Sequence, residues 1–333
     1  VFVMFGGMTG TGSIFDETWE FDGLHWTEST GSFPPDGRID LALAYDPLRQ
    51  RVVLHAGWTG FEALQDTWEY NGGEWSRVDT ADAPPVRSSH GMVYDAARQR
   101  VVVFGGEDAA RNCYGDTWEY DGTTWTQVFP AVSPPGRRYV DLAYDPLRQR
   151  VVMFGGTAGS ATNWTFHADT WEYDGTTWTQ VSTPTAPPAR HGYRMDWDAE
   201  AQRVVLFGGL GDDYTVRNDL WTYDGTTWTE VELIPKPPAR LQFSMAYDPD
   251  HSRLLVQGGM EETYTSWDDT WLLSGGAWTE TLLVVPPQRL SSAMVYHSAL
   301  GQIVLFGGAT DRDYDTFLGD TWIYDGAFWQ DAT

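Results

Sequence analysis

Short apolar runs of four to eight residues recur along the whole chain and are separated by glycine, proline or aspartate. The runs are rich in β-branched and aromatic residues, as in residues 150–154, which read Arg-Val-Val-Met-Phe. This length and composition are typical of β-strands. No segment shows the 3.6-residue period of an amphipathic helix. The pattern therefore predicts an all-β protein.

The runs belong to a repeated unit that contains a Gly-Gly or Ala-Gly pair. The second glycine of each pair lies at 7, 57, 106, 156, 209, 259 and 308, so the period is 49 to 53 residues. Most units continue with a motif close to Asp-Thr-Trp-Glu-Tyr-Asp-Gly and then Trp-Thr, as in residues 116–126. Each unit supplies four strand-like segments, apart from the first. A period of this length indicates a repeat architecture of stacked supersecondary units.

Turn residues determine how the segments of one unit connect. Asp121-Gly122 and its counterparts separate the third and fourth segments, where a tight hairpin needs the positive φ that glycine and aspartate tolerate. Asp-Pro-Leu-Arg at 46–49 and 145–148 makes the equivalent turn between the first and second segments. One four-stranded antiparallel sheet cannot bury both faces, but seven arranged radially can. We therefore predict a seven-bladed β-propeller that forms a single domain over residues 1–333.

Six blades are complete in the sequence and one lacks a strand. The complete blades span residues 38–78, 87–128, 137–181, 190–231, 240–283 and 289–331. Residues 1–28 supply only the second, third and fourth strands of a seventh blade, so we predict 27 strands and an open innermost position beside residues 1–5. Either residues removed upstream of Val1 supply this strand, or a partner chain or neighbouring copy donates it.

The repeat resembles that of the kelch-repeat β-propellers, in its bacterial style with Tyr-Asp-Gly-Thr-Thr-Trp-Thr hairpins. The glycine pair that closes the second strand, the downstream aromatic pair and the arginine before the first strand all match, and the resemblance covers the whole chain. It implies four-stranded antiparallel blades with the first strand innermost. It leaves function open, because kelch-like propellers include scaffolds, lectin-like binders and a few enzymes.

Charge excludes two classes of partner. The chain has 21 Lys and Arg against 47 Asp and Glu, a formal net charge of −26. A polyanion such as DNA, or an anionic membrane surface, would be repelled. No apolar run approaches the roughly 18 residues of a membrane-spanning helix. The single cysteine, Cys113, allows neither an internal disulfide nor a cysteine-based zinc site.

Charged residues that recur once per blade are predicted to be architectural. Each complete blade has an arginine in or after its Pro-Pro motif and an aspartate before its third strand. We expect these pairs: Arg38 with Asp66, Arg87 with Asp116, Arg137 with Asp169, Arg190 with Asp219, Arg240 with Asp269, and Arg289 with Asp320.

The residues that deviate from the repeat gather in the loops after the glycine pairs. Strand alternation places all seven loops and the Pro-Pro-x-Arg segments at one end of the propeller. The candidate ligand- or partner-binding residues there are Trp58, Phe61, Tyr114, Trp164, Phe166, His167, Tyr214, Tyr264, Trp267, Tyr314 and Phe317. Aromatic faces beside carboxylates suit a carbohydrate or a protein partner. We therefore predict a non-catalytic binding or interaction domain, with Trp197 in the core because it replaces a recurring tyrosine.

A second group of deviations lies on the predicted innermost strands. Asp141 and Arg194 occupy the same level of adjacent blades, so we expect a direct ion pair, with Asp196 in the same network. The alternative function is a carbohydrate-active enzyme at the channel mouth. Its candidate catalytic residues are His90, His191, Arg138, Tyr193 and Asp196. Motifs for serine hydrolases, zinc proteases and phosphate-binding loops are absent from the sequence.

Calcium is the one cofactor that the sequence suggests. Asp311, Asp313 and Asp315 place three carboxylates at alternate positions of one loop, and Ca²⁺ prefers hard oxygen ligands of this kind. Thr316 stands where an EF-hand loop has glycine, so the segment is not an EF-hand. No other cofactor is expected.

Overall fold

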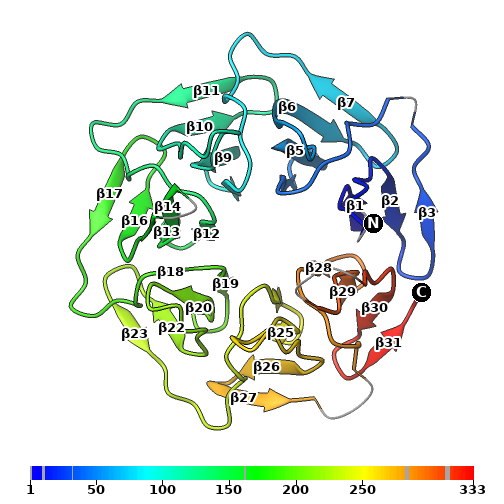
Figure 1. Ribbon diagram of the computed structural model, residues 1–333, viewed down its shortest axis with the longest axis vertical. Coiled ribbons are helices and arrows are strands. Elements are labelled where there is room, and N and C mark those ends of the chain that lie inside the picture. The colour runs from blue at the N-terminus through cyan, green and yellow to red at the C-terminus, as the bar shows by residue number, and fades with distance from the viewer. Residues whose placement is uncertain (1, 10–11, 32, 161–162, 282–284, 312–315) are drawn as a thin grey trace.

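The protein forms a ring of seven sheets around a central axis (Figure 1). The computed structural model describes residues 2–9, 12–31, 33–160, 163–281, 285–311 and 316–333. Each sheet is one blade, and the blades follow one another in chain order. All strands that pair within a blade are antiparallel, as the hairpin sequences predict. The predicted seven-bladed propeller is confirmed.

The first blade has three strands and the other six have four. The first blade consists of β1 (Phe2–Phe5), β2 (Thr18–Phe21) and β3 (Trp26–Glu28). From inside outward, the second to fourth blades consist of β4 (Ala42–Asp46), β5 (Arg51–Trp58), β6 (Ala63–Tyr70) and β7 (Trp75–Val78); β8 (Gly91–Asp95), β9 (Arg100–Phe104), β10 (Thr117–Tyr120) and β11 (Trp125–Val128); β12 (Asp141–Asp145), β13 (Arg150–Phe154), β16 (Thr170–Tyr173) and β17 (Trp178–Val181). The fifth to seventh consist of β19 (Arg194–Asp198), β20 (Arg203–Phe207), β22 (Leu220–Tyr223) and β23 (Trp228–Glu230); β24 (Ser244–Asp248), β25 (Arg253–Gln257), β26 (Thr270–Ser274) and β27 (Ala277–Glu280); β28 (Ala293–His297), β29 (Gln302–Phe306), β30 (Thr321–Tyr324) and β31 (Trp329–Asp331).

The described residues contain the 27 predicted blade strands and two short additional ladders. One ladder pairs β14 (Thr157–Ser160) with β15 (Asn163–Phe166), and the other pairs β18 (Arg190–His191) with β21 (Leu210–Gly211). Both ladders lie in connecting segments that the apolar pattern did not mark as strands.

The second strand of each four-stranded blade forms its core, because neighbouring blades cover both of its faces. In β13, Val151 and Met153 pack in the cluster shared with the third blade, while Val152 and Phe154 pack in the cluster shared with the fifth. All four side chains are fully buried. Burial of a side chain of this size stabilises the fold by about 1.5–3 kcal/mol relative to exposure. The continuous apolar runs of the sequence therefore reflect strands that are buried on both faces.

Hydrogen bonds from fourth-strand tryptophans join neighbouring blades. Trp178 Nε1 donates to Thr117 Oγ1 of the preceding blade at 2.7 Å. The same bond joins Trp26 of the first blade to Thr321 of the last at 2.5 Å. Phe21 packs in one cluster with residues of the last blade. Contacts between blade faces therefore connect the first and last blades.

The predicted arginine–aspartate pairs are all present. Each guanidinium is fully buried, and the pairs are Arg38–Asp66, Arg87–Asp116, Arg137–Asp169, Arg190–Asp219, Arg240–Asp269 and Arg289–Asp320. In the fifth blade, both terminal nitrogens of Arg190 bond the Asp219 carboxylate at 2.6 Å, and Nη1 also donates to the Gly208 carbonyl at 3.0 Å. Trp221 Nε1 donates to the same carboxylate at 2.7 Å. These bonds tie the start of a blade to its second and third strands.

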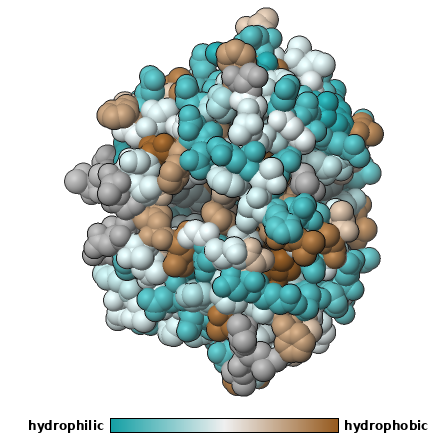
Figure 2. Space-filling model, turned by 90° about the vertical axis from the view of Figure 1, so that its right-hand side faces the viewer, coloured by the Kyte–Doolittle hydropathy of each residue, from teal (hydrophilic) through white to brown (hydrophobic). Residues whose placement is uncertain are grey.

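The outer rim shows a different composition from the core. On the side that carries β3 and β31, hydrophilic residues predominate and apolar ones lie in scattered groups (Figure 2).

Trp197 is half-buried and packs against the core cluster between the fourth and fifth blades, as predicted. Over the described ranges, no helix has the length and apolar character needed to cross a membrane.

Candidate functional site at the channel mouth

The loops after the glycine pairs and the segments that contain the structural arginines lie at one end of the propeller, as predicted. Backbone bridges hold them together, for example between Ile39 and Trp58 and between Arg138 and Thr157. We call this end the loop face. The opposite end carries the Asp-Pro and Asp-Gly turns, and we call it the turn face.

One residue per complete blade, two positions after the structural arginine, adopts a left-handed backbone conformation at the inner edge of the loop face. These residues are Asp40, Ser89, Tyr139, Gly192, Gln242 and Ser291, with φ between 51° and 66°. We call them the mouth ring. Backbone bonds run between neighbours, with the Ser89 amide donating to the Asp40 carbonyl at 3.1 Å and the Tyr139 amide to the Ser89 carbonyl at 3.0 Å. A non-glycine residue in this region costs about 1–2 kcal/mol, so the surrounding blades impose the conformation.

The mouth ring surrounds a cavity of about 390 Å³ at the end of the channel. All six ring residues line it, together with side chains of the innermost strands such as Asp141 and Arg194 and the buried His90 and Tyr193. A volume of this size suits one or two side chains of a partner or a small ligand.

A buried ion pair fixes the cavity's rim between the third and fourth blades. Arg138 and Glu107 bond each other with side chains 1% and 5% exposed, and Arg111 adds a bond to Glu107 at 2.9 Å. Removal of one partner from such a pair leaves a buried charge without compensation. The pair therefore holds the third blade's loop against the start of the fourth blade.

An aromatic cluster covers Arg138 on the solvent side. The guanidinium lies 4.8 Å from the ring centroid of Trp164, and Trp164 stacks on Tyr139 at 6.3 Å with an interplanar angle of 13°. The ring of His191 contacts Trp164 and Phe166 at centroid distances of 5.5 and 5.4 Å. We call Arg138, Tyr139, Trp164, Phe166 and His191 the Arg138 cluster. Such cation–π contacts contribute about 0.5–2 kcal/mol, and they hold flat aromatic faces beside the cavity.

The β14–β15 ladder positions the two loop residues of the cluster. Trp164 and Phe166 alternate along β15 and so share one face of the hairpin, while Thr157 at its base bridges to Arg138. Tyr214 of the next blade's loop extends the row, with an edge contact to Phe166 at 6.2 Å.

Apart from Tyr214, which contacts Phe166, the other predicted binding residues do not join this cluster. Phe61, Tyr214 and Tyr264 are 91%, 69% and 51% exposed. Tyr114 lies against the structural Arg87 at 4.7 Å, and Trp267 Nε1 donates to the Ala239 carbonyl at 3.3 Å. Half-buried positions are occupied by Trp58, His167 and Phe317, and Tyr314 lies outside the described residues.

The predicted ion pair between Asp141 and Arg194 is wrong. No such pair occurs within 4 Å among the described residues; the Arg194 Nε donates instead to the Phe243 carbonyl at 3.4 Å. The Asp141 carboxylate accepts the Met195 amide of the neighbouring innermost strand at 2.9 Å. Asp196 does the same for the Tyr247 amide at 3.2 Å. Inner-strand edges have free backbone donors, and these carboxylates bind them rather than a cation.

Burial shifts the titration of the groups around the mouth. Burial raises the pKa of Asp196 to about 6 and, with the nearby Glu107 carboxylate, raises that of Asp40. Burial lowers the pKa of His191 to about 4, and Arg138 adds to the effect. The pKa of His90 is lowered to about 3, again mainly by burial. Both histidines are therefore neutral near pH 7.

The five candidate catalytic residues make separate sets of contacts, although His90 and Tyr193 line the same cavity. Arg138 and His191 belong to the Arg138 cluster, whereas the Tyr193 hydroxyl donates to the Phe154 carbonyl. His90 contacts the buried His55 ring, and Asp196 lies further along its strand with its two amide donors.

Within the described part of the chain, no group of three or more His, Cys, Asp or Glu side chains could hold a metal ion. Of the calcium candidates, Asp313 and Asp315 lie outside the described residues, and Asp311 is described.

Some features of the mouth went unnoticed in the sequence. The mouth ring contains five residue types, so no recurring amino acid marks it in the sequence. Its constant offset from the structural arginine is the one signal that could have revealed it. Glu107 occurs in a single blade, and its partner lies 31 residues away.

Comparison with known families gives one result. A family model described as the KLHDC2/KLHL20/DRC7 Kelch-repeats domain matches residues 69–234, from the third strand of the second blade to the connection after the fifth. No curated protein shows significant similarity to the chain.

Proposed function

Because the chain belongs to the kelch-repeat family of β-propellers, we propose that it is a non-catalytic protein-interaction domain whose binding site is the mouth of the channel on the loop face. Kelch propeller domains typically mediate protein interactions. The observation that carries the proposal is the 390 Å³ cavity within the mouth ring, bordered by the Arg138 cluster.

The geometry favours a protein segment as the occupant. A chain end or loop of a partner can insert one or two side chains into the cavity while its neighbours lie across Trp164 and Tyr139. Interface hot spots are enriched in Trp, Tyr and Arg and cluster in well-packed, desolvated pockets. The mouth ring adds polar groups, which suit the backbone of an extended segment. The net charge of −26 favours partner segments that are neutral or basic.

A peptide-display selection tests the proposal. The folded protein is exposed to a random dodecapeptide library, and the enriched peptides are titrated against Trp164→Ala. We expect affinity to fall by at least about tenfold, since Trp164 is the central ring of the cluster. Phe129→Ala is the matched control, because Phe129 is an exposed aromatic residue of an outer loop and should leave affinity unchanged.

The two other functional hypotheses have their own arms in this experiment. A glycan array that binds the wild type but not Trp164→Ala would replace the protein partner with a carbohydrate. Turnover of an oligosaccharide that is lost in His191→Ala at unchanged stability would show an enzyme. Equal peptide affinities of Trp164→Ala and Phe129→Ala would overturn the proposed site.

A further inference from the structure

On the turn face, a group of three side chains recurs between neighbouring blades. Between the second and third blades, Arg49 of the first turn pairs with Asp46 at 2.8 Å and with Glu69 of β6. The hydroxyl of Tyr120, from the next blade, donates to the same Glu69 at 2.8 Å. The guanidinium lies 5.5 Å from the Tyr120 ring centroid. Arginine, glutamate and tyrosine together fill the space between these blades.

The same group fills the space between the fourth and fifth blades. Arg148 pairs with Asp145 at 2.7 Å and with Glu172, and Tyr223 donates to Glu172 at 2.7 Å. The hairpin glycine of the next blade covers the arginine, since a Cβ on Gly225 would lie 2.3 Å from Arg148 Nε.

Between the fifth and sixth blades, all three members are replaced by smaller side chains. Alignment of the repeats places Ala201 at the arginine position, Thr222 at the glutamate position and Leu273 at the tyrosine position. A Cβ on Gly275 or Gly276 of the β26–β27 hairpin would meet nothing within 4 Å. The covering hairpin is therefore retained while the group beneath it is lost.

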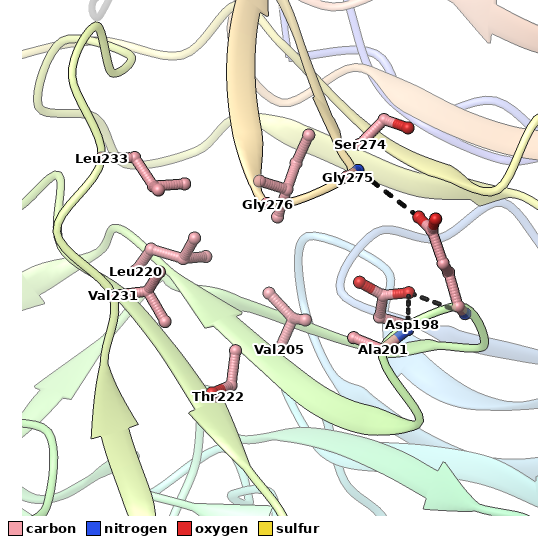
Figure 3. Close-up of a pocket in the computed structure, with 12 residues that line it drawn as sticks. Asp198, Ala201, Val205, Leu220, Thr222, Val231, Leu233, Ser274, Gly275 and Gly276 are labelled. Atoms are coloured by element: carbon pink, nitrogen blue, oxygen red, sulfur yellow. Dashed lines mark hydrogen bonds between the residues drawn. The ribbon is translucent and has the colours of Figure 1, made fainter.

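The lost volume appears as a pocket of about 290 Å³. Its apolar wall consists of Val205, Leu220, Val231, Leu233 and Leu273. Figure 3 shows Val205, Leu220, Val231 and Leu233 on one side and the hairpin glycines across from them. This volume lies at the lower end for ligand pockets and suits a ligand of fragment size.

The carboxylate that binds arginine in the second, third, fourth and sixth blades remains in place. Asp198 occupies the position of Asp46 and Asp145, and its Oδ1 accepts the amides of Glu200 and Ala201 at 3.0 Å. No ion pair within 4 Å involves Asp198 in the part of the chain that the structure describes. Glu200 adds a second carboxylate, which lies 3.5 Å from the Gly275 amide. The pocket thus combines apolar walls with a carboxylate that has lost its guanidinium.

We propose that the pocket between the fifth and sixth blades binds an alkyl- or arylguanidinium cation, with the apolar part between Val205 and Leu273 and the guanidinium on Asp198. The ligand would restore the interactions that Arg148 and Tyr223 make one blade earlier. Guanidinium suits this site better than ammonium, because its planar donors match a carboxylate bidentately and its faces pack on apolar surface. The site is on the opposite end from the channel mouth and does not depend on the function proposed there.

Phenylguanidine, titrated into the protein and followed by NMR, tests this site. We expect saturable binding with a dissociation constant below about 10 mM, and chemical-shift changes at Leu220 and Gly275. The neutral isostere phenylurea should bind at least about tenfold more weakly. Ala201→Arg restores the arginine that stands at this position in the second, third and fourth blades, and it should abolish binding. Ala199→Arg adds the same charge at an adjacent exposed position outside the pocket and should leave affinity within about twofold.

Two further arms make the result decisive. Asp198→Asn keeps an oxygen for the turn amides but removes the charge, so phenylguanidine should bind about as weakly as phenylurea. If a Gly-Gly-Arg-Gly-Gly peptide binds as well as phenylguanidine, the natural ligand is an arginine side chain of a partner protein. If phenylguanidine binds and the peptide does not, the natural ligand is a small molecule. Equal affinity for phenylguanidine and phenylurea, unchanged binding in Ala201→Arg, or no saturable binding to the wild type would overturn the proposal.

Discussion

At the scale of single residues, charge in this protein is stabilising where every donor and acceptor is matched. Arg240 bonds Asp269 through both terminal nitrogens at 2.7 and 2.8 Å, and also the carbonyls of Gly258 and Pro238. The exposed pair of Arg77 and Asp79, at 3.3 Å, is in contrast largely solvated. The same residue types therefore contribute very different free energies at the two positions.

Arg240→Met should lower the free energy of unfolding by about 3–5 kcal/mol, because it leaves the buried carboxylate of Asp269 without its partner. Arg77→Met removes the exposed pair and should change it by less than about 1 kcal/mol. Urea unfolding of both variants measures the difference. A loss below about 1 kcal/mol in Arg240→Met would contradict the architectural role of the repeated pairs.

Asp196 should make stability depend on pH. Its pKa, raised by burial to about 6, exceeds that of the unfolded chain, so the folded state binds more protons between about pH 4 and 6. Its contribution to stability is complete below pH 4 and declines as pH rises through 6. The free energy of unfolding of Asp196→Asn, taken relative to that of the wild type, should therefore rise by on the order of 1–3 kcal/mol from pH 4 to pH 7.5. Denaturant unfolding at both pH values measures this gain, and a difference that does not change with pH would refute the shifted pKa.

At the scale of elements, the sequence predicted what the repeat imposes and missed what occurs once. Blade strands, hairpins and arginine–aspartate pairs recur with one period, so each copy supports the others. The β14–β15 ladder occurs in one loop and has no such support. Asp141 and Arg194 were correctly placed at one level of the channel, but strand-edge amides satisfy Asp141 instead of the guanidinium. The mouth ring is defined by its backbone conformation and is formed by residues of different types, so the amino-acid sequence alone does not reveal it.

The three-stranded first blade has a measurable consequence. β1 pairs with β2 alone in the described residues, whereas β9 lies between β8 and β10. Backbone amides of residues 3–5 should therefore exchange with solvent faster than those of residues 101–103 by at least about tenfold. Hydrogen exchange of the 333-residue chain measures both segments. Equal protection at all concentrations would show that the inner edge of β1 is covered, and protection that increases with concentration would show strand donation by a neighbouring copy.

At the scale of the whole molecule, the propeller presents two ends with different chemistry. The loop face combines the mouth ring, the cavity and the Arg138 cluster. The turn face carries the arginine–glutamate–tyrosine group between the second and third and between the fourth and fifth blades, and has a pocket in its place between the fifth and sixth. A ring of blades holds both ends rigid, since each blade packs on two neighbours. The two proposed sites can therefore be tested separately on one folded protein.

Hydrogen-exchange footprinting of the protein with its tightest selected dodecapeptide is the most direct test of the proposed binding site. We predict increased protection at residues 138–139, 163–166 and 191, around the mouth of the channel, and the loss of this protection in Trp164→Ala. Protection confined to the Asp-Pro and Asp-Gly turns at the opposite end would contradict the assignment of the loop face as the interaction surface.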